Sequence, residues 1–404
     1  MRASRFVRVV SFVGVLVFVA GCAGSSGGGA SASRSSAGAG TTASPSSSPR
    51  FPVPDRRSLP PRQSAALQDV LDGVVSLEAR APGSGVPGLT AAVLTDHGAW
   101  TGAAGKDGVG ALLSPNAMML IASVTKTFLA AEVLHLVDAG QVDLDAPLSR
   151  YVNHPLAGNG ATVRQALSMH GGFRDIPHVD QLRALGRILA TSHHHTTVQQ
   201  SLAFWTAPST RPGGDPVYSS TGFVLLGMLV EHVTHHVVAH ALRADLFTPA
   251  GLQRIVAQDP ERPTAPVAAP RPEVGVPSRD AYLPCRSVAS LGNDSASGVA
   301  ADASTLARWG YQLYGGRVLP PRLTAMMLTS ASSASIFPGT GYGLGTMLFE
   351  GLSPDVAVGH LGDLGLYSAA LVVVPARHQS IAVLADGLMP DSRLIVRQLL
   401  IALA

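Results

Sequence analysis

Apolar and polar residues recur along the chain with two different periods, and these periods predict its elements. Apolar residues at three- and four-residue steps predict helices, which span 64–79, the segment between Ser123 and Gly140, 162–169, 180–204, 223–233, 303–314, 321–328 and 392–403. Short apolar or alternating stretches predict strands at 88–95, 99–104, 343–350, 366–374 and 380–385.

The predicted strands lie near both ends of the chain, and helices fill the region between them. This order predicts an α+β fold in which both ends supply strands to one antiparallel sheet flanked by helices. The mostly helical middle then forms a second lobe, and a cleft between sheet and lobe is where we expect the active site. Residues 253–297 are rich in Pro, Arg and Ala without a sustained period, and we interpret them as a long surface loop that covers the cleft.

The first 63 residues have the pattern of an exported, tethered protein. Residues 1–21 contain three arginines, the apolar run Val9–Phe18 and then small residues, as in a signal peptide. The apolar run is too short to cross a membrane, which takes about 20 residues. Val19-Ala20-Gly21-Cys22 resembles the bacterial lipobox, which predicts lipidation of Cys22 at the outer face of the cell membrane; a plain secretory signal is the alternative. Residues 22–63 predict a flexible Gly/Ser/Ala/Pro tether, and 64–404 one folded domain.

The basic pI of about 9.1 originates in the leader. The formal net charge is +3, and the leader carries three arginines and no acid, so the remaining chain has a net charge of zero. No basic patch interleaved with aromatic residues occurs, which argues against nucleic acid as a partner. With Cys22 lipidated, Cys285 is the remaining cysteine. We therefore expect no internal disulfide, and we interpret Cys285 as a small buried apolar residue.

Ser123 and Lys126 lie one turn apart at the predicted start of a helix. Amides at a helix start favour an anionic intermediate and disfavour a protonated lysine. The 29 basic residues include two lysines, Lys106 and Lys126, and the rest are arginines, which cannot lose their proton. The pattern therefore indicates a serine nucleophile activated by a neutral lysine. The alternative is a helix N-cap with a solvated lysine.

Three motifs follow one another along the chain: Ser123-Val124-Thr125-Lys126, Tyr218-Ser219-Ser220 and His360-Leu361-Gly362. The set resembles the serine β-lactamase and penicillin-binding superfamily, and most of all its branch of class C β-lactamases, D-alanyl-D-alanine carboxypeptidases and related esterases. Those enzymes carry Ser-x-x-Lys, Tyr-x-Asn and Lys- or His-x-Gly. The resemblance extends from about Val86 to the C-terminus and includes flanking sequence such as Tyr342-Gly343-Leu344-Gly345. It implies a β-lactamase-like serine hydrolase domain over 64–404.

The resemblance also assigns roles to single residues. Ser123 attacks a carbonyl and becomes acylated, while Lys126 and Tyr218 share the proton, with Tyr218 as the general base or its relay. Because a phenol ionises only near positive charge, Lys126 and His360 are expected to supply that charge. The backbone N–H groups of Ser123 and Asp363 form the oxyanion hole, with Asp363 on an edge strand. Gly362 lets substrate approach that backbone.

Two residues depart from the family motifs. Ser220 replaces the asparagine of Tyr-x-Asn, and Leu361 stands where a threonine often binds a substrate carboxylate. Both changes remove groups that hold a β-lactam or a D-Ala-D-Ala peptide. We therefore expect a lipid-anchored serine hydrolase that cleaves an ester or amide, on a small molecule or a cell-wall peptide, rather than an efficient β-lactamase. The alternatives are a D-Ala-D-Ala carboxypeptidase or β-lactamase, for which Arg164 or Arg174 would have to bind the carboxylate, and a catalytically idle lipoprotein that binds cell-wall peptide.

Two groups of histidines, 193–195 and the helically spaced set 232, 235, 236 and 240, raise the question of a metal. Neither has an acidic or cysteine partner at ligand spacing, so we interpret them as a loop and a solvated helix face and expect no metal. Fingerprints for dinucleotides or phosphate loops are also lacking, so we expect no cofactor. The Gly-x-Ser-x-Gly elbow of the α/β-hydrolases does not occur.

Overall fold

A computed structural model of the 404-residue chain describes residues 50–55, 57–176, 180, 197–207, 209–257, 261–263, 265–270, 295–330 and 332–404. These residues all fall within one structural unit, Pro45–Ala404. The predicted leader, Cys22, His193 to His195 and Cys285 lie outside the described residues, as does much of the predicted 180–204 helix and of the 253–297 loop.

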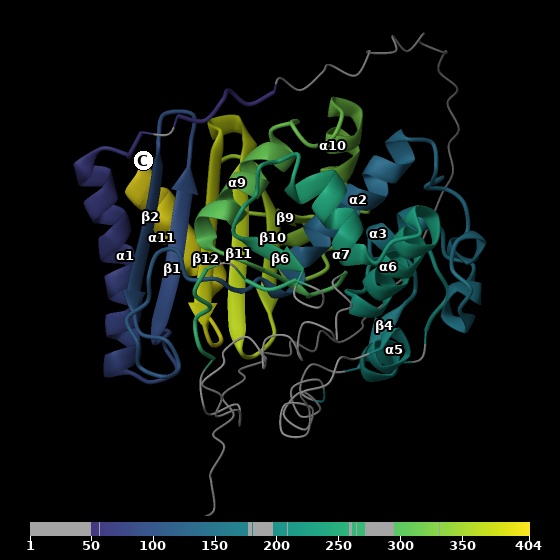
Figure 1. Ribbon diagram of the computed structural model, residues 1–404, viewed down its shortest axis with the longest axis horizontal. Helices are drawn as coiled ribbons and strands as arrows, with labels where there is room; N and C mark the ends of the chain where they lie inside the picture. The colour runs from purple at the N-terminus through teal and green to yellow at the C-terminus, as the bar shows by residue number, and fades with distance from the viewer. Residues whose placement is uncertain are drawn as a thin grey trace, which may run out of the picture. The chain divides into compact units, whose positions relative to one another are not determined.

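A seven-stranded antiparallel sheet is the frame of the structure (Figure 1). Its strand order is β2-β1-β12-β11-β10-β9-β8. The strands are β1 (Gly88–Leu94), β2 (Ala99–Gly105), β8 (Thr340–Tyr342), β9 (Met347–Phe349), β10 (Ala357–Asp363), β11 (Tyr367–Val374) and β12 (Gln379–Asp386). Strand β1 pairs with β12 over six residue pairs, from Leu89 with Ala385 to Leu94 with Ser380. The prediction that both ends of the chain build one sheet is therefore confirmed.

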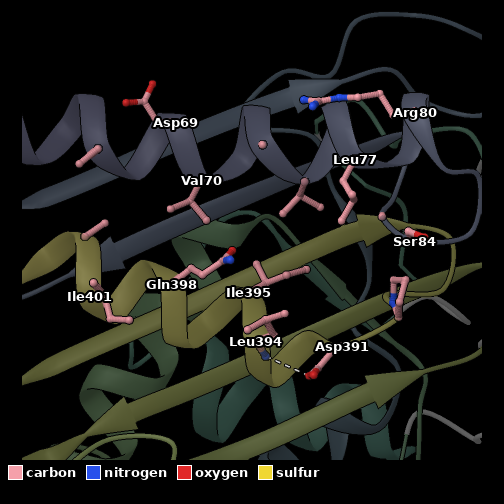
Figure 2. Close-up of a pocket in the computed structure, with 16 residues that line it drawn as sticks. Asp69, Val70, Leu77, Arg80, Ser84, Asp391, Leu394, Ile395, Gln398 and Ile401 are labelled. Carbon is pink, nitrogen blue, oxygen red and sulfur yellow. Dashed lines mark hydrogen bonds between the residues drawn. The ribbon is translucent and has the colours of Figure 1, made fainter.

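Helices cover both faces of this sheet. On one face α1 (Pro61–Arg80) and α11 (Ser392–Leu403) pack against each other, and on the other face α9 (Ala303–Tyr314) packs against β1, β11 and β12 (Figure 1). A groove of about 620 Å³ runs between α1 and α11 (Figure 2). Apolar side chains such as Leu77, Leu394 and Ile401 line it, and it shares no lining residue with the pocket around Ser123.

The middle of the chain is mostly helical, as predicted. Its helices are α2 (Thr125–Asp138), α3 (Val163–Leu167), α5 (Val198–Trp205), α6 (Ser220–Thr234), α7 (Val238–Ala241), the π-helix Leu242–Phe247 and α10 (Pro321–Met327), with short 3₁₀ turns at Ala122–Val124, Leu148–Arg150, Pro155–Asn159 and Pro375–Arg377. A three-stranded sheet, β3-β7-β6, joins Met119–Leu120, Val299–Ala301 and Ile255–Ala257. A two-stranded ribbon pairs β4 (Arg174–Asp175) with β5 (Thr206–Ala207).

Helix α2 is buried along almost its whole length. Its Phe128 ring stacks on Trp309 of α9 with 4.0 Å between ring centroids. The Trp309 Nε1–H donates to the Thr127 hydroxyl at 2.9 Å, and that hydroxyl donates to the Val124 carbonyl at 2.9 Å. These contacts fix the rotation of α2 about its axis, because Thr127 and Phe128, which directly follow Lys126, are held in the core.

Local structure differs from the predictions at three places. The strand predicted over 343–350 is found only at Met347–Phe349, as β9, because 343–346 is the turn of a hairpin with β8, in which Gly343 N–H donates to Thr346 O at 2.8 Å and Gly345 has φ +69°. Only glycine adopts that conformation readily, so the chain turns there. Strand β10 was not predicted from the periodicity. The 253–297 segment is not wholly a loop, since Ile255–Ala257 forms β6 in the small sheet.

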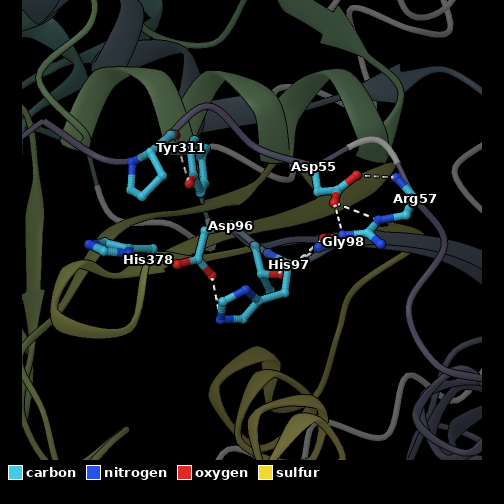
Figure 3. A network of polar contacts seen from close by, with 9 residues as sticks. Asp55, Arg57, Asp96, His97, Gly98, Tyr311 and His378 are labelled. Carbon is cyan, nitrogen blue, oxygen red and sulfur yellow. Dashed lines mark hydrogen bonds and ion pairs between the residues drawn. The ribbon is translucent and has the colours of Figure 1, made fainter.

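The predicted tether 22–63 also needs correction at its end, because residues before 64, among them Phe51, Arg57 and Leu59, are hydrogen-bonded to the domain (Figure 3). Phe51 is buried, and its N–H donates to Gly315 O at 3.1 Å. The Tyr311 hydroxyl donates to Pro52 O at 3.1 Å. Next to this contact Asp96 lies 3.1 Å from a ring nitrogen of His378, whose ring also contacts Phe51. The folded unit therefore begins at least a dozen residues earlier than residue 64.

None of the helices in the described ranges is by itself long and apolar enough to cross a membrane. Helix α6 and the segment Val238–Phe247, bent by 70° from each other, reach the necessary length and hydropathy only when taken as a pair.

Candidate active site

Ser123 lies in a tight turn between β3 and α2. Residues 122–124 form a 3₁₀ turn, and Ala122 has φ +47°, a left-handed conformation that costs a residue with a Cβ roughly 1–2 kcal/mol. The turn is held from outside by β7, since Ile121 N–H donates to Val299 O at 3.0 Å and Val299 N–H donates to the Thr125 hydroxyl at 3.2 Å. The Ser123 side chain is partly exposed and lines a pocket. The prediction of a serine at a helix start is confirmed.

Lys126, the second residue of α2, is fully buried beside Ser123. Its Nζ lies 3.0 Å from Ser123 Oγ, 3.3 Å from Ser220 Oγ and 3.0 Å from the carbonyl oxygen of Ala296. Burial lowers the pKa of Lys126 to about 7, against a smaller opposing effect of Asp175. A neutral amine at this position can donate to the Ala296 carbonyl and accept the Ser123 hydroxyl proton. The geometry thus fits a general base that works near neutral pH.

Tyr218 lines the same pocket, and the Lys126 Nζ lies 5.0 Å from the centre of its ring. Its hydroxyl oxygen is buried and has no hydrogen-bond partner of ordinary geometry among the described residues. Burial raises the pKa of Tyr218 well above 10; Ser123 is near enough to oppose this shift, and Asp175 adds to it. Tyr218 is therefore a neutral phenol, which does not fit the role of a phenolate base.

His360 does not occupy the place that we expected. It is fully buried and is not among the residues that line the pocket. Its Nε2 lies 3.0 Å from the Tyr342 hydroxyl oxygen and its Nδ1 lies 2.5 Å from the Leu361 carbonyl oxygen. Burial, and then the nearby Lys126, lower the pKa of His360 to about 3. The expectation that His360 supplies positive charge or contacts substrate is wrong, because the ring is fully buried, neutral and not part of the pocket lining.

Gly362 brings β10 against the Ser123 turn. A Cβ at this position would lie 2.3 Å from the Ile121 carbonyl oxygen, 3.0 Å from Ala122 Cβ and 3.1 Å from Ser123 N. The glycine is thus required first for the approach of strand and turn, whereas we had expected it to admit substrate. We expected an edge strand here, but β10 lies between β11 and β9 in the sheet. Its pairing with β9 covers only Ala357–Gly359, so Gly362 lies beyond the paired part. Asp363, at its end, lines the pocket as the predicted oxyanion role requires.

The pocket around Ser123 has a volume of about 470 Å³, which is within the usual range for a small-molecule site. Apart from Gly362, its lining falls into three chemical groups. The apolar members are Ile176, Phe337, Met347, Leu361, Leu364 and Met389; the hydroxyl-bearing ones are Ser123, Tyr218, Ser220, Ser297, Ser368 and Ser392; and the charged ones are Asp175 and Asp363. Among the described residues that line this pocket, both charged side chains are acidic.

The arginines that we considered as carboxylate binders are placed elsewhere. Arg164 donates to both carboxylate oxygens of Asp145, at 2.7 and 3.0 Å. Arg174 is exposed on β4 and does not belong to the lining of the pocket. Neither side chain is therefore in position to bind a substrate carboxylate next to Ser123.

Sequence reasoning missed two side chains of the site and one backbone group. Asp175 caps the start of α6, Ser297 lines the pocket with a buried hydroxyl that has no partner in the described part of the chain, and the Ala296 carbonyl holds Lys126. None of them belongs to a periodic pattern. The sequence contains one signal that could have pointed to Asp175: it follows the Gly171-Gly172 pair closely, and paired glycines mark turns.

Four of the histidines that raised the question of a metal lie within the described residues. His232, His235, His236 and His240 lie on or after α6, and the rings of His236 and His240 are 4.5 Å apart. Within the described residues, no three or more His, Cys, Asp or Glu side chains form a group able to hold a metal ion.

Comparison with known proteins places the chain in a family. A family model described as Beta-lactamase matches residues 74–404. Penicillin-binding protein 4 of Amycolatopsis lactamdurans is 28% identical over 321 residues, which cover 75% of this chain and 81% of that protein.

Solved structures show the same fold. A D-stereospecific amidohydrolase from Streptomyces sp. aligns with a TM-score of 0.68 and 26% identity, over 82% of this chain and 97% of that one. The D-amino acid amidase of Ochrobactrum anthropi SV3, in complex with D-phenylalanine, aligns with a TM-score of 0.70 and 22% identity, over 84% of this chain and 98% of that one. The family match, the relative and the fold agree with the order of the three motifs. The chain therefore belongs to the Beta-lactamase family, within the serine β-lactamase and penicillin-binding superfamily of serine hydrolases.

Proposed function

We propose that this protein is an acyl-enzyme-forming hydrolase that cleaves an uncharged ester or amide at Ser123. The contact between Lys126 Nζ and Ser123 Oγ, 3.0 Å long, carries the proposal. A lysine whose pKa is about 7 is half neutral at physiological pH and can take the serine proton as the carbonyl is attacked. Tyr218, as a neutral phenol, then passes the proton on to the leaving group.

The lining of the pocket supports an uncharged substrate next to the scissile bond. A carboxylate there would meet Asp175 and Asp363 and the apolar side chain of Leu361, without a cation among the described lining residues. Such a carboxylate would lose its hydration without gaining a charged partner. The Ser220 hydroxyl, which replaces the family's asparagine, already contacts Lys126 at 3.3 Å. These features favour esterase-like or amidase-like chemistry over β-lactam or D-Ala-D-Ala hydrolysis.

We propose further that the protein is exported and lipid-anchored through Cys22. The leader with its lipobox-like end supports this proposal, and so does the Gly/Ser/Ala-rich composition between Cys22 and the folded unit. The intact mass of the protein extracted from bacterial membranes tests it. An acylated mature chain that begins at residue 22 is expected, and a chain that keeps residues 1–21 or lacks acyl groups contradicts the anchor.

The pH profile of kcat/KM reports on the proposed base. Because Lys126 accepts a proton only when neutral, the rate of ester hydrolysis should rise about tenfold per pH unit below pH 7 and level off above it. The pKa of His360, about 3, is too low to produce this limb. Initial rates between pH 5 and 9 check the prediction, and a profile that is flat from pH 5 to 8 contradicts it.

Covalent probes separate the candidate functions. We expect the purified protein to form a fluorophosphonate adduct, seen by intact mass, that disappears in the Ser123→Ala variant. We expect no lasting adduct with penicillin and much faster hydrolysis of an aryl ester than of a cephalosporin. A penicillin adduct on Ser123 would support the carboxypeptidase alternative, comparable rates on ester and cephalosporin would remove the esterase preference, and no adduct with either probe would support the idle binding lipoprotein.

A further inference from the structure

The carboxylate of Asp175 contacts the segment that carries the second motif. Its Oδ2 accepts a hydrogen bond from Ser220 N–H at 2.5 Å, and its Oδ1 accepts one from Thr221 N–H at 3.0 Å and one from the Ser219 hydroxyl at 3.1 Å. Ser219 is itself the N-cap of α6, since its Oγ accepts from Gly222 N–H at 3.1 Å. The first turn of α6 is therefore tied to a residue 45 positions away in sequence.

The β4–β5 ribbon keeps Asp175 in this position. Asp175 pairs with Thr206 across the ribbon, and the hydroxyl of Thr206 lies 3.3 Å from that of Thr221 in the first turn of α6. Both strands of the ribbon thus contact the same helical turn. A carboxylate suits the start of a helix, because the free N–H groups and the helix dipole are positive there.

We propose that Asp175 is a positioning residue of this active site, whose carboxylate holds the start of α6 so that Tyr218 and Ser220 face Lys126. This inference rests on the proposed function, because it assigns Asp175 to the machinery that acylates Ser123. Ser220 is the link: its N–H donates to Asp175, and its hydroxyl oxygen lies 3.3 Å from Lys126 Nζ. Loss of the carboxylate frees the turn and loosens the contact with the base.

The charge of Asp175 has a second effect on the same base. Three titratable groups surround Lys126: Asp175 on β4, Tyr218 before α6 and His360 on β10. Tyr218 is a neutral phenol and His360 a neutral imidazole, so Asp175 is the anion of the three. It raises the pKa of Lys126 against the larger effect of burial. Removing the charge alone should therefore let Lys126 lose its proton at lower pH.

The test compares Asp175→Asn with Asp302→Asn. Asparagine keeps the size of the side chain but removes the charge and one of the two acceptor oxygens, so either Ser220 N–H or Thr221 N–H loses its acceptor. We expect kcat/KM for an aryl ester to fall about tenfold at pH 8, and the acid limb of its pH profile to move about one unit lower. Asp302 is the control, because it is a buried N-cap of α9 that accepts from Thr305 N–H at 2.7 Å, pairs with Arg254 and does not line the pocket. Asp302→Asn should lower stability without moving the acid limb.

A second variant, Asp175→Glu, separates charge from geometry. It retains the negative charge but not the reach of the carboxylate, so we expect a lower kcat with the acid limb unmoved. The inference is overturned if Asp175→Asn has the wild-type profile and rate, or if both asparagine variants lose activity only in proportion to their thermal destabilisation. If Asp175→Asn does not fold, an Asp175→Glu protein with wild-type kcat overturns it instead. Failure of the wild-type protein to label with fluorophosphonate would refute the proposed function itself, whatever the Asp175 variants do.

Discussion

Replacement of Lys126 by methionine is expected to slow acylation of Ser123 by about 10²- to 10⁴-fold, the usual contribution of a general base. Methionine matches the length of the lysine stem and fits a fully buried site, but it cannot accept a proton. Lys126→Arg should be as slow, because arginine keeps the positive charge but does not deprotonate. The second-order rate of fluorophosphonate labelling, followed by intact mass, measures the effect.

Lys106 provides the control for this experiment, since it is the other lysine of the chain and is exposed on the surface. Lys106→Arg should label at the wild-type rate. If Lys126→Arg is nearly as active as the wild type, the amine acts through its charge alone, and the role of base passes to another group. Thermal unfolding of each variant shows whether lost labelling reflects lost fold.

Replacement of Gly362 by alanine is the second change with a large expected effect. The new Cβ would lie 2.3 Å from the Ile121 carbonyl oxygen, a backbone atom that cannot rotate away. Strand β10 and the Ser123 turn must therefore separate, which would move apart the amides of Ser123 and Asp363 that we propose as the oxyanion hole. We expect kcat/KM to fall by about 100-fold or more, as when a donor of an oxyanion hole is removed. The free energy of unfolding should fall by about 1–3 kcal/mol.

Gly341 on β8 offers a matched glycine-to-alanine control. A Cβ there meets no atom closer than 3.7 Å, so Gly341→Ala should leave both activity and stability near wild type. Steady-state kinetics and thermal unfolding of the two variants give the comparison. An active Gly362→Ala protein would mean that the turn and the strand can move apart without harm, and that the oxyanion is held by other donors.

The sequence predicts most of the fold because its signals are local. Helices such as 392–403 have a clear three- and four-residue apolar period, and the strands near both ends are short apolar stretches between turns. The turn at 343–346 was not predicted, because its glycines lie inside a stretch whose apolar pattern otherwise resembles a strand. Strand β10 was not predicted from the apolar pattern, because His360 and two glycines, Gly359 and Gly362, interrupt that pattern.

The site was predictable only where its residues share an element. Ser123 and Lys126 are three positions apart, in the 3₁₀ turn and the first turn of α2 that follows it directly, so spacing alone brings them together. Asp175, Ser297 and the Ala296 carbonyl reach the site through tertiary packing, which no local period encodes. His360 shows the opposite error: its motif is in the expected place, but the side chain points to Tyr342 within the core instead of toward the pocket.

The presence of two lysines, one exposed and one buried, has a spectroscopic consequence. Isotope labelling restricted to lysine would give a magnetic resonance spectrum with one signal from Lys106 and one from Lys126. The Lys106 signal serves as an internal reference for an ordinary solvated amine. The second signal then follows the protonation of the buried amine directly in the resting protein, without a substrate, so the acid–base state of the site can be read independently of turnover.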